Sequence, residues 1–255
     1  MNPLNHLRRM LAASRSGAAF TGAGISTESG IPDFRSPGGI WSHTRPIEFS
    51  DFLASEDIRR EYWRRKFVLD RDIRQARPNR GHLALSKLVQ MGKISCIITQ
   101  NIDGLHQAAG VPAEKVVELH GNTTYAACLD CGKRFELEAI QADFERKGIL
   151  PVCDGCGGIV KTATISFGQA MPKAAMQSAE AEIRDCDLFL AIGSSLVVYP
   201  AAAFPEMAKR LGSQLVIINR DPTPLDAIAD LVLHAEIGAT LSAVVEGGGE
   251  LPGWP

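Results

Sequence analysis

The chain has 255 residues, of which 45% are hydrophobic, 22% charged and 6% aromatic. This composition is that of an ordinary globular protein of one to one and a half domains, and it argues against intrinsic disorder. The 27 Lys and Arg residues nearly balance the 29 Asp and Glu residues. The formal charge of −2 therefore provides no overall field that would favour nucleic acid or an anionic membrane as a partner.

The N-terminal segment lacks an apolar core of signal-peptide length. An uncharged stretch from Leu188 to Phe204 is shorter than the ~20 residues that a membrane-spanning helix needs, and it contains Pro200. We therefore expect a cytoplasmic protein without a membrane partner, in a compartment where cysteines stay reduced or bind metal.

Six short apolar runs lack polar alternation, which is typical of strands that are buried on both faces. They are Ala18–Thr21, Ile94–Thr99, Val116–Leu119, Leu188–Ile192, Leu215–Ile218 and Leu231–Leu233. Helical apolar spacing lies between most of them, at His82–Met91, Ala174–Arg184 and Ala201–Leu211. This alternation predicts an α/β fold with a doubly wound, Rossmann-like parallel sheet.

Two stretches interrupt the alternation of strands and helices. Residues 41–80 are Arg-rich and helical in pattern, and residues 124–161 contain four cysteines and several glycines. We interpret them as a helical insertion and a zinc-ribbon insertion that together form a smaller lobe. The Rossmann-like domain would then comprise residues 1–40, 81–123 and 162–250, followed by a loose tail at 251–255.

Four of the six cysteines form two CxxC pairs with 21 residues between them. The pairs are Cys128 with Cys131 and Cys153 with Cys156. Two such pairs can close a tetrahedral four-sulfur site, which suits a structural zinc ion because no position is left for water. Two disulfides or unrelated buried cysteines are the alternatives. Cys96 and Cys186 lie in or beside predicted strands, where we expect small core residues.

A glycine turn, Gly22-Ala23-Gly24, follows the first predicted strand. A strand, a glycine turn and a helix start can hold a pyrophosphate through backbone N–H groups. Thr27, however, stands where the dinucleotide fingerprint has its third glycine. A turn that only packs a strand closely against a helix is an equal alternative.

Polar segments also follow other predicted strands or the glycine turn, at 30–35, 99–106 and 119–122. A core would not favour polar groups at these positions. Because the carboxyl ends of parallel strands meet at one sheet edge, we expect a shared ligand site there.

Together these segments resemble the sirtuin family of NAD-dependent protein lysine deacylases, most closely its compact prokaryotic type. The matching strings, in family order, are GAGIS at 22–26, GIPDFR at 30–35, TQNIDGLH at 99–106, LHG at 119–121, the CxxC pairs, GSS at 193–195, Asn219 and TPLD at 223–226. The resemblance implies a deacylase (deacetylase) that transfers the acyl group to ADP-ribose and releases nicotinamide and free lysine. It also implies NAD as co-substrate, one structural zinc ion and acyl-lysine proteins as partners.

The resemblance also implies residue roles. His120 matches the catalytic base, and Asn101, which would contact the nicotinamide ribose, is the second catalytic candidate. The NAD-binding candidates are Gly22, Ala23, Gly24, Asp33, Phe34, Arg35, Gln100, Asn101, Asp103, Gly193, Ser194, Ser195 and Asn219. Among them, Asp103 would hold the nicotinamide carboxamide. Phe167, Gly168 and Val197 are candidates for the substrate side.

The chain departs from the family pattern on this substrate side, where Thr162 replaces a proline and Gln169 an acidic residue. Tyr62 and Arg65 have the Y-x-x-R spacing of a residue pair that binds the carboxylate of succinyl-lysine in some relatives. Residues 56–80 hold nine Arg or Lys and five Asp or Glu, so a solvated amphipathic helix is the alternative.

Three other functions remain open at this stage: a hydride-transferring NAD oxidoreductase, a mono-ADP-ribosyltransferase and a zinc-ribbon nucleic-acid binder. The near-neutral charge argues against the last of them. We expect a monomer, whereas the acyl preference and the target proteins are not specified by these motifs.

Overall fold

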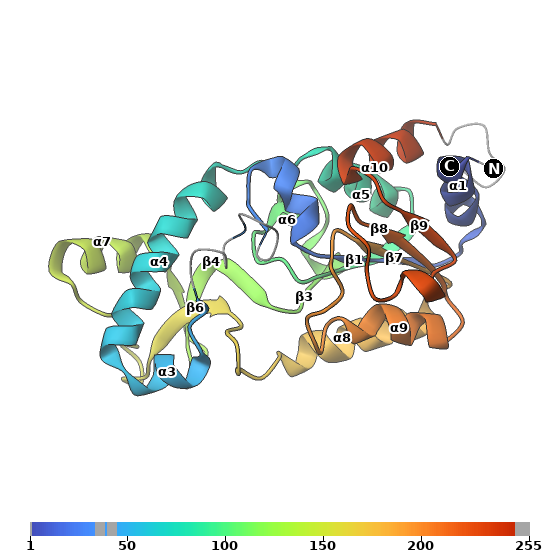
Figure 1. Cartoon of the computed structure of the whole chain (residues 1–255). Coiled ribbons are helices and arrows are strands. Elements are labelled where there is room, and N and C mark those ends of the chain that lie inside the picture. The colour runs from blue at the N-terminus through green and yellow to red at the C-terminus, as the bar shows by residue number, and fades with distance from the viewer. Residues whose placement is uncertain (1, 34–38, 40–44, 248–255) are drawn as a thin grey trace.

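The computed structural model of the chain describes residues 2–33, 39 and 45–247. Its main feature is a six-stranded parallel sheet in the order β3-β2-β1-β7-β8-β9 (Figure 1). The strands are β1 Gly17–Thr21, β2 Ile94–Thr99, β3 Val116–Glu118, β7 Leu188–Ile192, β8 Gln214–Ile218 and β9 Leu231–Leu233. All six predicted strands are confirmed. The strand order reverses between β1 and β7, as in the doubly wound folds that bind ligands at this point.

Helices cover both faces of this sheet (Figure 1). One face carries α1 Pro3–Ala13, α5 Arg80–Gln90 and α10 Ile237–Glu246, and the other carries α8 Lys173–Asp185 and α9 Ala203–Arg210. Neighbouring strand residues alternate between the two cores, so that Leu190 packs on the first face and Phe189 on the second. Because both faces are apolar, the strands read as continuous hydrophobic runs.

The smaller lobe contains a three-stranded antiparallel sheet in the order β5-β4-β6. Its elements are β4 Gly121–Cys128, β5 Arg134–Glu136, β6 Val160–Thr164, α7 Leu137–Lys147, α3 Phe49–Ala54 and α4 Glu56–Gln75. Trp63 and Phe67 of α4 share one hydrophobic core with Leu137 and Val160. The helical segment and the cysteine-rich segment therefore pack as one unit, while the exact domain boundaries stay a prediction.

The two sheets meet at Gly121, which follows the third parallel strand and begins β4. Gly121 has a positive φ of 72°, and a side chain there would collide with the carbonyl oxygen of Ala163 on β6. Only glycine relieves both constraints. As a result, His120 lies at the junction of the two sheets.

The remaining elements are short: η1 Ala23–Ser29, α6 Leu105–Ala108, η2 Ala113–Lys115 and η3 Asp226–Ile228. The expected helix after the glycine turn is thus a 3₁₀ helix, η1. Cys96 and Cys186 are buried core residues, as expected. Within the described ranges, no helix is both long and apolar enough to cross a membrane.

Candidate active site

A cavity of about 760 Å³ lies at the carboxyl ends of the parallel strands. Its volume is within the usual range for small-molecule sites. The NAD-binding candidates that line it are Gly22, Ala23, Gly24, Asp33, Gln100, Asn101, Gly193, Ser194, Ser195 and Asn219. Phe34 and Arg35 lie outside the described residues. The structure therefore brings the loops after β1, β2, β7 and β8 to one cavity.

The glycine turn after β1 packs directly on the turn after β7. The Gly24 amide donates to the Gly193 carbonyl oxygen at 2.8 Å. Gly193 has a φ of 63°, and a Cβ atom there would lie 2.5 Å from the Ile25 nitrogen. The close-packing turn considered as an alternative is therefore present. Because the same turn lines the cavity, close packing and ligand contact are compatible.

Two amide side chains connect the loop after β2 to its neighbours. Gln100 Nε2 donates to Ser194 Oγ at 2.9 Å, in the loop after β7. Asn101 Nδ2 donates to the Gly22 carbonyl oxygen at 3.0 Å and to Ser26 Oγ at 3.2 Å. These bonds orient both side chains at the cavity wall.

Asp103 lies in a second, smaller cavity of about 20 Å³. Its Oδ2 accepts a hydrogen bond from Ser26 Oγ at 2.7 Å, and its Oδ1 accepts one from the Leu105 amide at 2.9 Å. Asn101 and Ile102 line both cavities. The smaller cavity is therefore a neighbouring compartment that shares a wall with the larger one.

His120 lines the large cavity, and its Nδ1 lies 2.8 Å from the Gln100 carbonyl oxygen. A carbonyl oxygen only accepts, so Nδ1 carries the hydrogen and Nε2 keeps a lone pair. Burial lowers the pKa of His120, and the bond to the Gln100 carbonyl partly opposes this shift. A neutral imidazole with a basic nitrogen can accept a proton from a bound hydroxyl.

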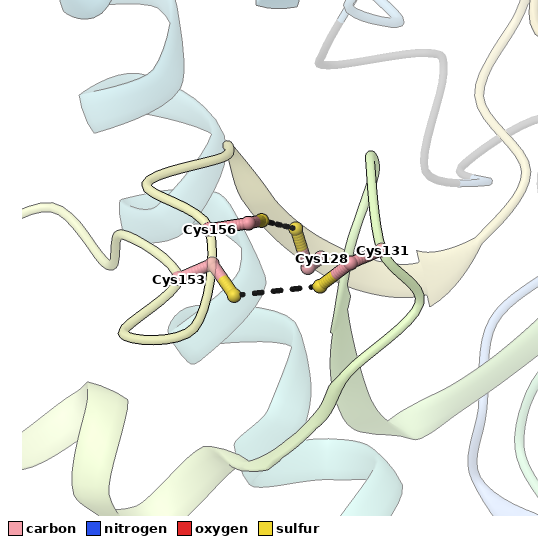
Figure 2. A group of neighbouring side chains, drawn as sticks. All are labelled: Cys128, Cys131, Cys153 and Cys156. Atoms are coloured by element: carbon pink, nitrogen blue, oxygen red, sulfur yellow. Dashed lines mark hydrogen bonds between the residues drawn. The ribbon is translucent and has the colours of Figure 1, made fainter.

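The four cysteine sulfurs of the CxxC pairs converge in the smaller lobe (Figure 2). All four lie within 4.8 Å of one another, with Cys128 and Cys156 at 3.5 Å and Cys131 and Cys153 at 3.6 Å. A tetrahedral zinc ion with Zn–S bonds of about 2.3 Å requires sulfurs about 3.8 Å apart, and a disulfide bond would be about 2.05 Å. The cluster therefore fits one zinc ion rather than two disulfides. Of the residues described, none of these cysteines lines the large cavity, which agrees with a structural ion.

Two of the substrate-side candidates, Phe167 and Gly168, follow β6 of the smaller lobe, and Val197 follows β7 of the parallel sheet. Phe167 and Gly168 line the large cavity, whereas Val197 is 47% exposed beside Val198, which does line it. The Phe167 carbonyl oxygen accepts a hydrogen bond from the Phe49 amide at 2.8 Å. This contact links the segment after β6 to α3.

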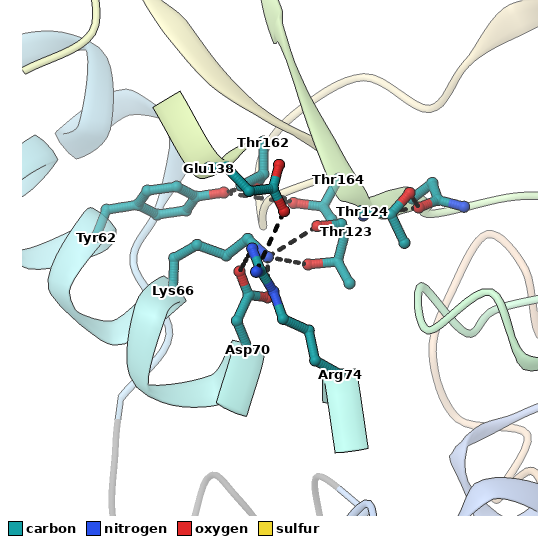
Figure 3. Close-up of polar contacts among 10 residues, drawn as sticks. Tyr62, Lys66, Asp70, Arg74, Thr123, Thr124, Glu138, Thr162 and Thr164 are labelled. Carbon is teal, nitrogen blue, oxygen red and sulfur yellow. Dashed lines mark hydrogen bonds and ion pairs between the residues drawn. The ribbon is translucent and has the colours of Figure 1, made fainter. Parts of the chain in front are cut away.

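Tyr62 and Arg65 do not converge on the cavity. The Tyr62 hydroxyl bonds to Thr162 Oγ1 and, at 3.4 Å, to Thr164 Oγ1 (Figure 3). Arg65 pairs with Glu61 at 2.7 Å. Among the residues that the structure describes, neither Tyr62 nor Arg65 lines the cavity, and their role as readers of an acyl carboxylate stays a prediction. Thr162, which departs from the family pattern, instead serves as a hydrogen-bond partner of Tyr62.

Further cavity residues were missed by the sequence reasoning. Arg220 and Asp221 line the cavity directly after Asn219. They are polar residues that follow a parallel strand, so their position in the sequence could have predicted them. Glu28 also lines it, and its Oε1 accepts a hydrogen bond from the Gly238 amide at 2.7 Å. No local signal predicts that contact, because its two residues are 210 positions apart.

Comparisons with known proteins agree with this geometry. The model of the Sir2 family matches residues 22–200. A protein of Rhodopseudomonas palustris named NAD-dependent protein deacetylase is 57% identical over 242 residues, which cover 95% of this chain and 96% of that protein.

Two solved structures are similar over nearly the whole chain. Sir2 with a p53 peptide and NAD+ has a TM-score of 0.88 and 37% identity, covering 96% of this chain and 98% of that one. A Sir2 variant with a deacetylated p53 peptide and 3′-O-acetyl ADP-ribose has a TM-score of 0.87, with the same identity and coverage. The chain therefore belongs to the Sir2 family.

Proposed function

We propose that this chain is an NAD-dependent protein lysine deacylase that acts on acetyl-lysine. Acyl-lysine, NAD and one water molecule are converted to free lysine, nicotinamide and an O-acyl-ADP-ribose. The observation that carries the proposal is the position of His120, with its basic Nε2, on the cavity lined by the predicted NAD loops. The name of the R. palustris relative and the ligands of the two similar Sir2 structures support it.

The described residues fit NAD as co-substrate. When bound, NAD supplies an ADP-ribosyl group and nicotinamide as its leaving group. Gly22 to Gly24 and Gly193 to Ser195 would hold the phosphates and Asn219 the adenosine ribose, all at the strand ends. Gln100 and Asn101 would orient the second ribose, and their hydrogen bonds to neighbouring loops hold them ready for this.

Asp103 and the smaller cavity would receive the nicotinamide ring, with the Asp103 carboxylate accepting from the carboxamide. His120 Nε2 would take a proton from a ribose hydroxyl, which makes that hydroxyl a better nucleophile. Because burial favours the neutral imidazole, His120 holds its lone pair available at neutral pH.

The four cysteines would hold one zinc ion and take no part in the reaction. The acyl-lysine segment of a protein substrate would lie along Phe167, Gly168 and Val197, adding a strand between the lobes. We further propose a monomer in the cytoplasm without a nucleic-acid partner. The thiolates of the cysteine cluster need a reducing compartment, which supports this location.

The zinc-loaded protein incubated with NAD and an acetyl-lysine peptide should release nicotinamide only when the peptide is acylated. Mass spectrometry should find free lysine and an acylated ADP-ribose. ADP-ribose attached to protein would instead indicate a mono-ADP-ribosyltransferase. A rise in reduced-nicotinamide absorbance would indicate an oxidoreductase. Absence of acyl-dependent nicotinamide release would refute the proposal.

His120→Ala should lower turnover by about 100-fold or more, since a general base contributes a factor of that order. His6→Ala on α1, away from the cavity, is the matched control and should keep wild-type turnover. Both variants should keep the wild-type melting temperature and zinc content. Full activity of the His120 variant would show that another group is the base.

A further inference from the structure

Helix α4 carries a lysine and an aspartate that are both removed from water. The side chains of Lys66 and Asp70, one helical turn apart, are only 5% and 7% exposed. The comparable Lys147–Asp143 pair of α7 is 58% and 50% exposed. Removing two charges from water costs free energy unless well-placed partners compensate for the lost hydration, so the partners of this pair determine whether its burial is tolerated.

The contacts of the Lys66 ammonium reach beyond its own helix (Figure 3). Lys66 Nζ donates to Asp70 Oδ1, to the Thr123 carbonyl oxygen at 2.8 Å and to Thr123 Oγ1 at 2.9 Å. An ammonium group has three hydrogens, so each has an acceptor. Two of the three bonds go to Thr123 on β4. Lys66 thus ties α4 to a strand 57 positions further along the chain.

Thr123 in turn connects to the loop after β2, which is part of the candidate active site. Its amide donates to the Ile102 carbonyl oxygen at 2.9 Å, between Asn101 and Asp103. Thr123 is buried and follows His120 by three residues. One ammonium group is therefore two hydrogen bonds away from the loop that carries Asp103.

The same face of α4 forms part of the smaller cavity. Leu69 and Ile73, which follow Lys66 by three and seven residues, line it together with Asn101 and Asp103. The cavity holds only about 20 Å³. A small shift of α4 would therefore open or close a substantial part of it.

We propose that Lys66, supported by Asp70, is a positioning residue for the nicotinamide compartment. Its ammonium clamps α4 to Thr123 and so holds Leu69 and Ile73 at a fixed distance from the Ile102–Asp103 loop. The proposal rests on the proposed function in one respect, because it takes the smaller cavity as the place of the nicotinamide ring. Burial lowers the pKa of Lys66, and Asp70 opposes this shift and thereby favours the charged form.

The test compares Lys66→Met, the double variant Lys66→Met/Asp70→Leu and the control Lys147→Met. The single variant leaves the Asp70 carboxylate buried without its ammonium partner, so its melting temperature should fall. The double variant removes both charges and should recover much of that temperature. It should still need about tenfold more nicotinamide for half-inhibition and show a raised KM for NAD, because the clamp is absent. The control should change none of these.

Amide hydrogen exchange at Thr123 gives a readout that does not depend on activity. It should be faster in both Lys66 variants and unchanged in the control. If the double variant has the same nicotinamide inhibition and the same exchange rate at Thr123 as the wild type, the pair only stabilises the fold. That result would overturn the proposal. An inactive wild type would instead count against the proposed function. Amide hydrogen exchange at Thr123 would then still test whether Lys66 holds α4 against β4.

If the double variant does not fold, the nearly isosteric Thr123→Val variant carries the test. It removes one acceptor of the ammonium and keeps the Lys66–Asp70 pair. It should show the same changes in nicotinamide inhibition and exchange to a smaller extent. Unchanged values for both would overturn the proposal.

Discussion

Two buried histidines, His82 of α5 and His106 of α6, lie with their rings 5.1 Å apart. His106 Nε2 lies 2.9 Å from Thr21 Oγ1, and His82 Nδ1 accepts from the Asn79 amide at 3.4 Å. Within the part of the chain that the structure describes, His106 Nδ1 and His82 Nε2 are buried without a hydrogen-bond partner. Burial lowers the pKa of His82 to about 4 and, together with the neighbouring His82, that of His106 to about 3.

These pKa values predict a loss of stability in mild acid. At a pH well above the ordinary histidine pKa of about 6.5, both imidazoles are neutral in the folded and in the unfolded chain. As the pH falls below that value, the unfolded chain takes up protons and the folded chain does not. Each histidine then costs roughly 1.4 kcal/mol per pH unit, or about 2 kcal/mol at pH 5.

Urea denaturation at pH 7.5 and pH 5 measures this effect. A variant with His82→Asn and His106→Gln, which cannot titrate in this range, should lose less of its unfolding free energy between the two pH values than the wild type. His6→Ala should behave like the wild type. Equal losses in the double variant and the wild type would show that other groups cause the pH dependence.

At the scale of elements, the cysteine cluster joins pieces that are too short to be stable alone. β5 has three residues, and the turn with Cys153 and Cys156 is bonded to the sheet by few backbone contacts, such as the Leu129 amide to the Ile159 carbonyl oxygen. Cys128 and Cys153 also belong to the core that α4 covers. A zinc ion would therefore hold together the sheet from which β6 leads into the large cavity.

Cys131→Ser should reduce the zinc content from about one ion per chain towards zero, measured by mass spectrometry of the metal. The melting temperature should fall by about 5 °C or more, and deacylation should be lost with it because the substrate side is no longer supported. Cys186→Ala, outside the cluster, should keep one zinc ion. A fully active, metal-free Cys131 variant would contradict a structural role for zinc.

At the scale of the whole molecule, the two lobes share the walls of one cavity. The strand ends contribute Gly22 and Ser194, and the segment after β6 contributes Ile165 and Phe167. The Ile165 amide donates to the His120 carbonyl oxygen at 2.8 Å, which joins the lobes beside the proposed base. Ligands that fill this cavity should therefore stabilise the molecule as a unit.

NAD and an acetyl-lysine peptide should raise the melting temperature of the His120→Ala variant, in which the expected loss of turnover, about 100-fold or more, limits consumption of the ligands during the measurement. A ligand at 100 times its Kd adds about 2.7 kcal/mol, equivalent to roughly 5–10 °C in a chain of this size. The two ligands together should give a larger shift than either alone. No shift with either ligand, in a thermal-shift assay, would argue against this cavity as their site.

Local patterns in the sequence determined the sheet and the pairing of the four cysteines, and the resemblance to the sirtuin family implied the NAD-binding candidates. Strands buried on both faces must be apolar throughout, as Leu188–Ile192 is. Polar residues directly after such strands, such as Asn101 and His120, meet at one edge because parallel strands end there. Each of these signals lies within a few neighbouring residues.

Only the tertiary structure decided which distant side chains meet. The contact of Glu28 with Gly238, the clamp from Lys66 to Thr123 and the diversion of Tyr62 to Thr162 each join segments 57 to 210 positions apart. From the sequence, α4 could either contribute residues that bind an acyl carboxylate or be a solvated amphipathic helix. The structure shows that one face of α4 is buried against β4 and the smaller cavity. Packing selects among such partners through shape and desolvation, which no local pattern encodes.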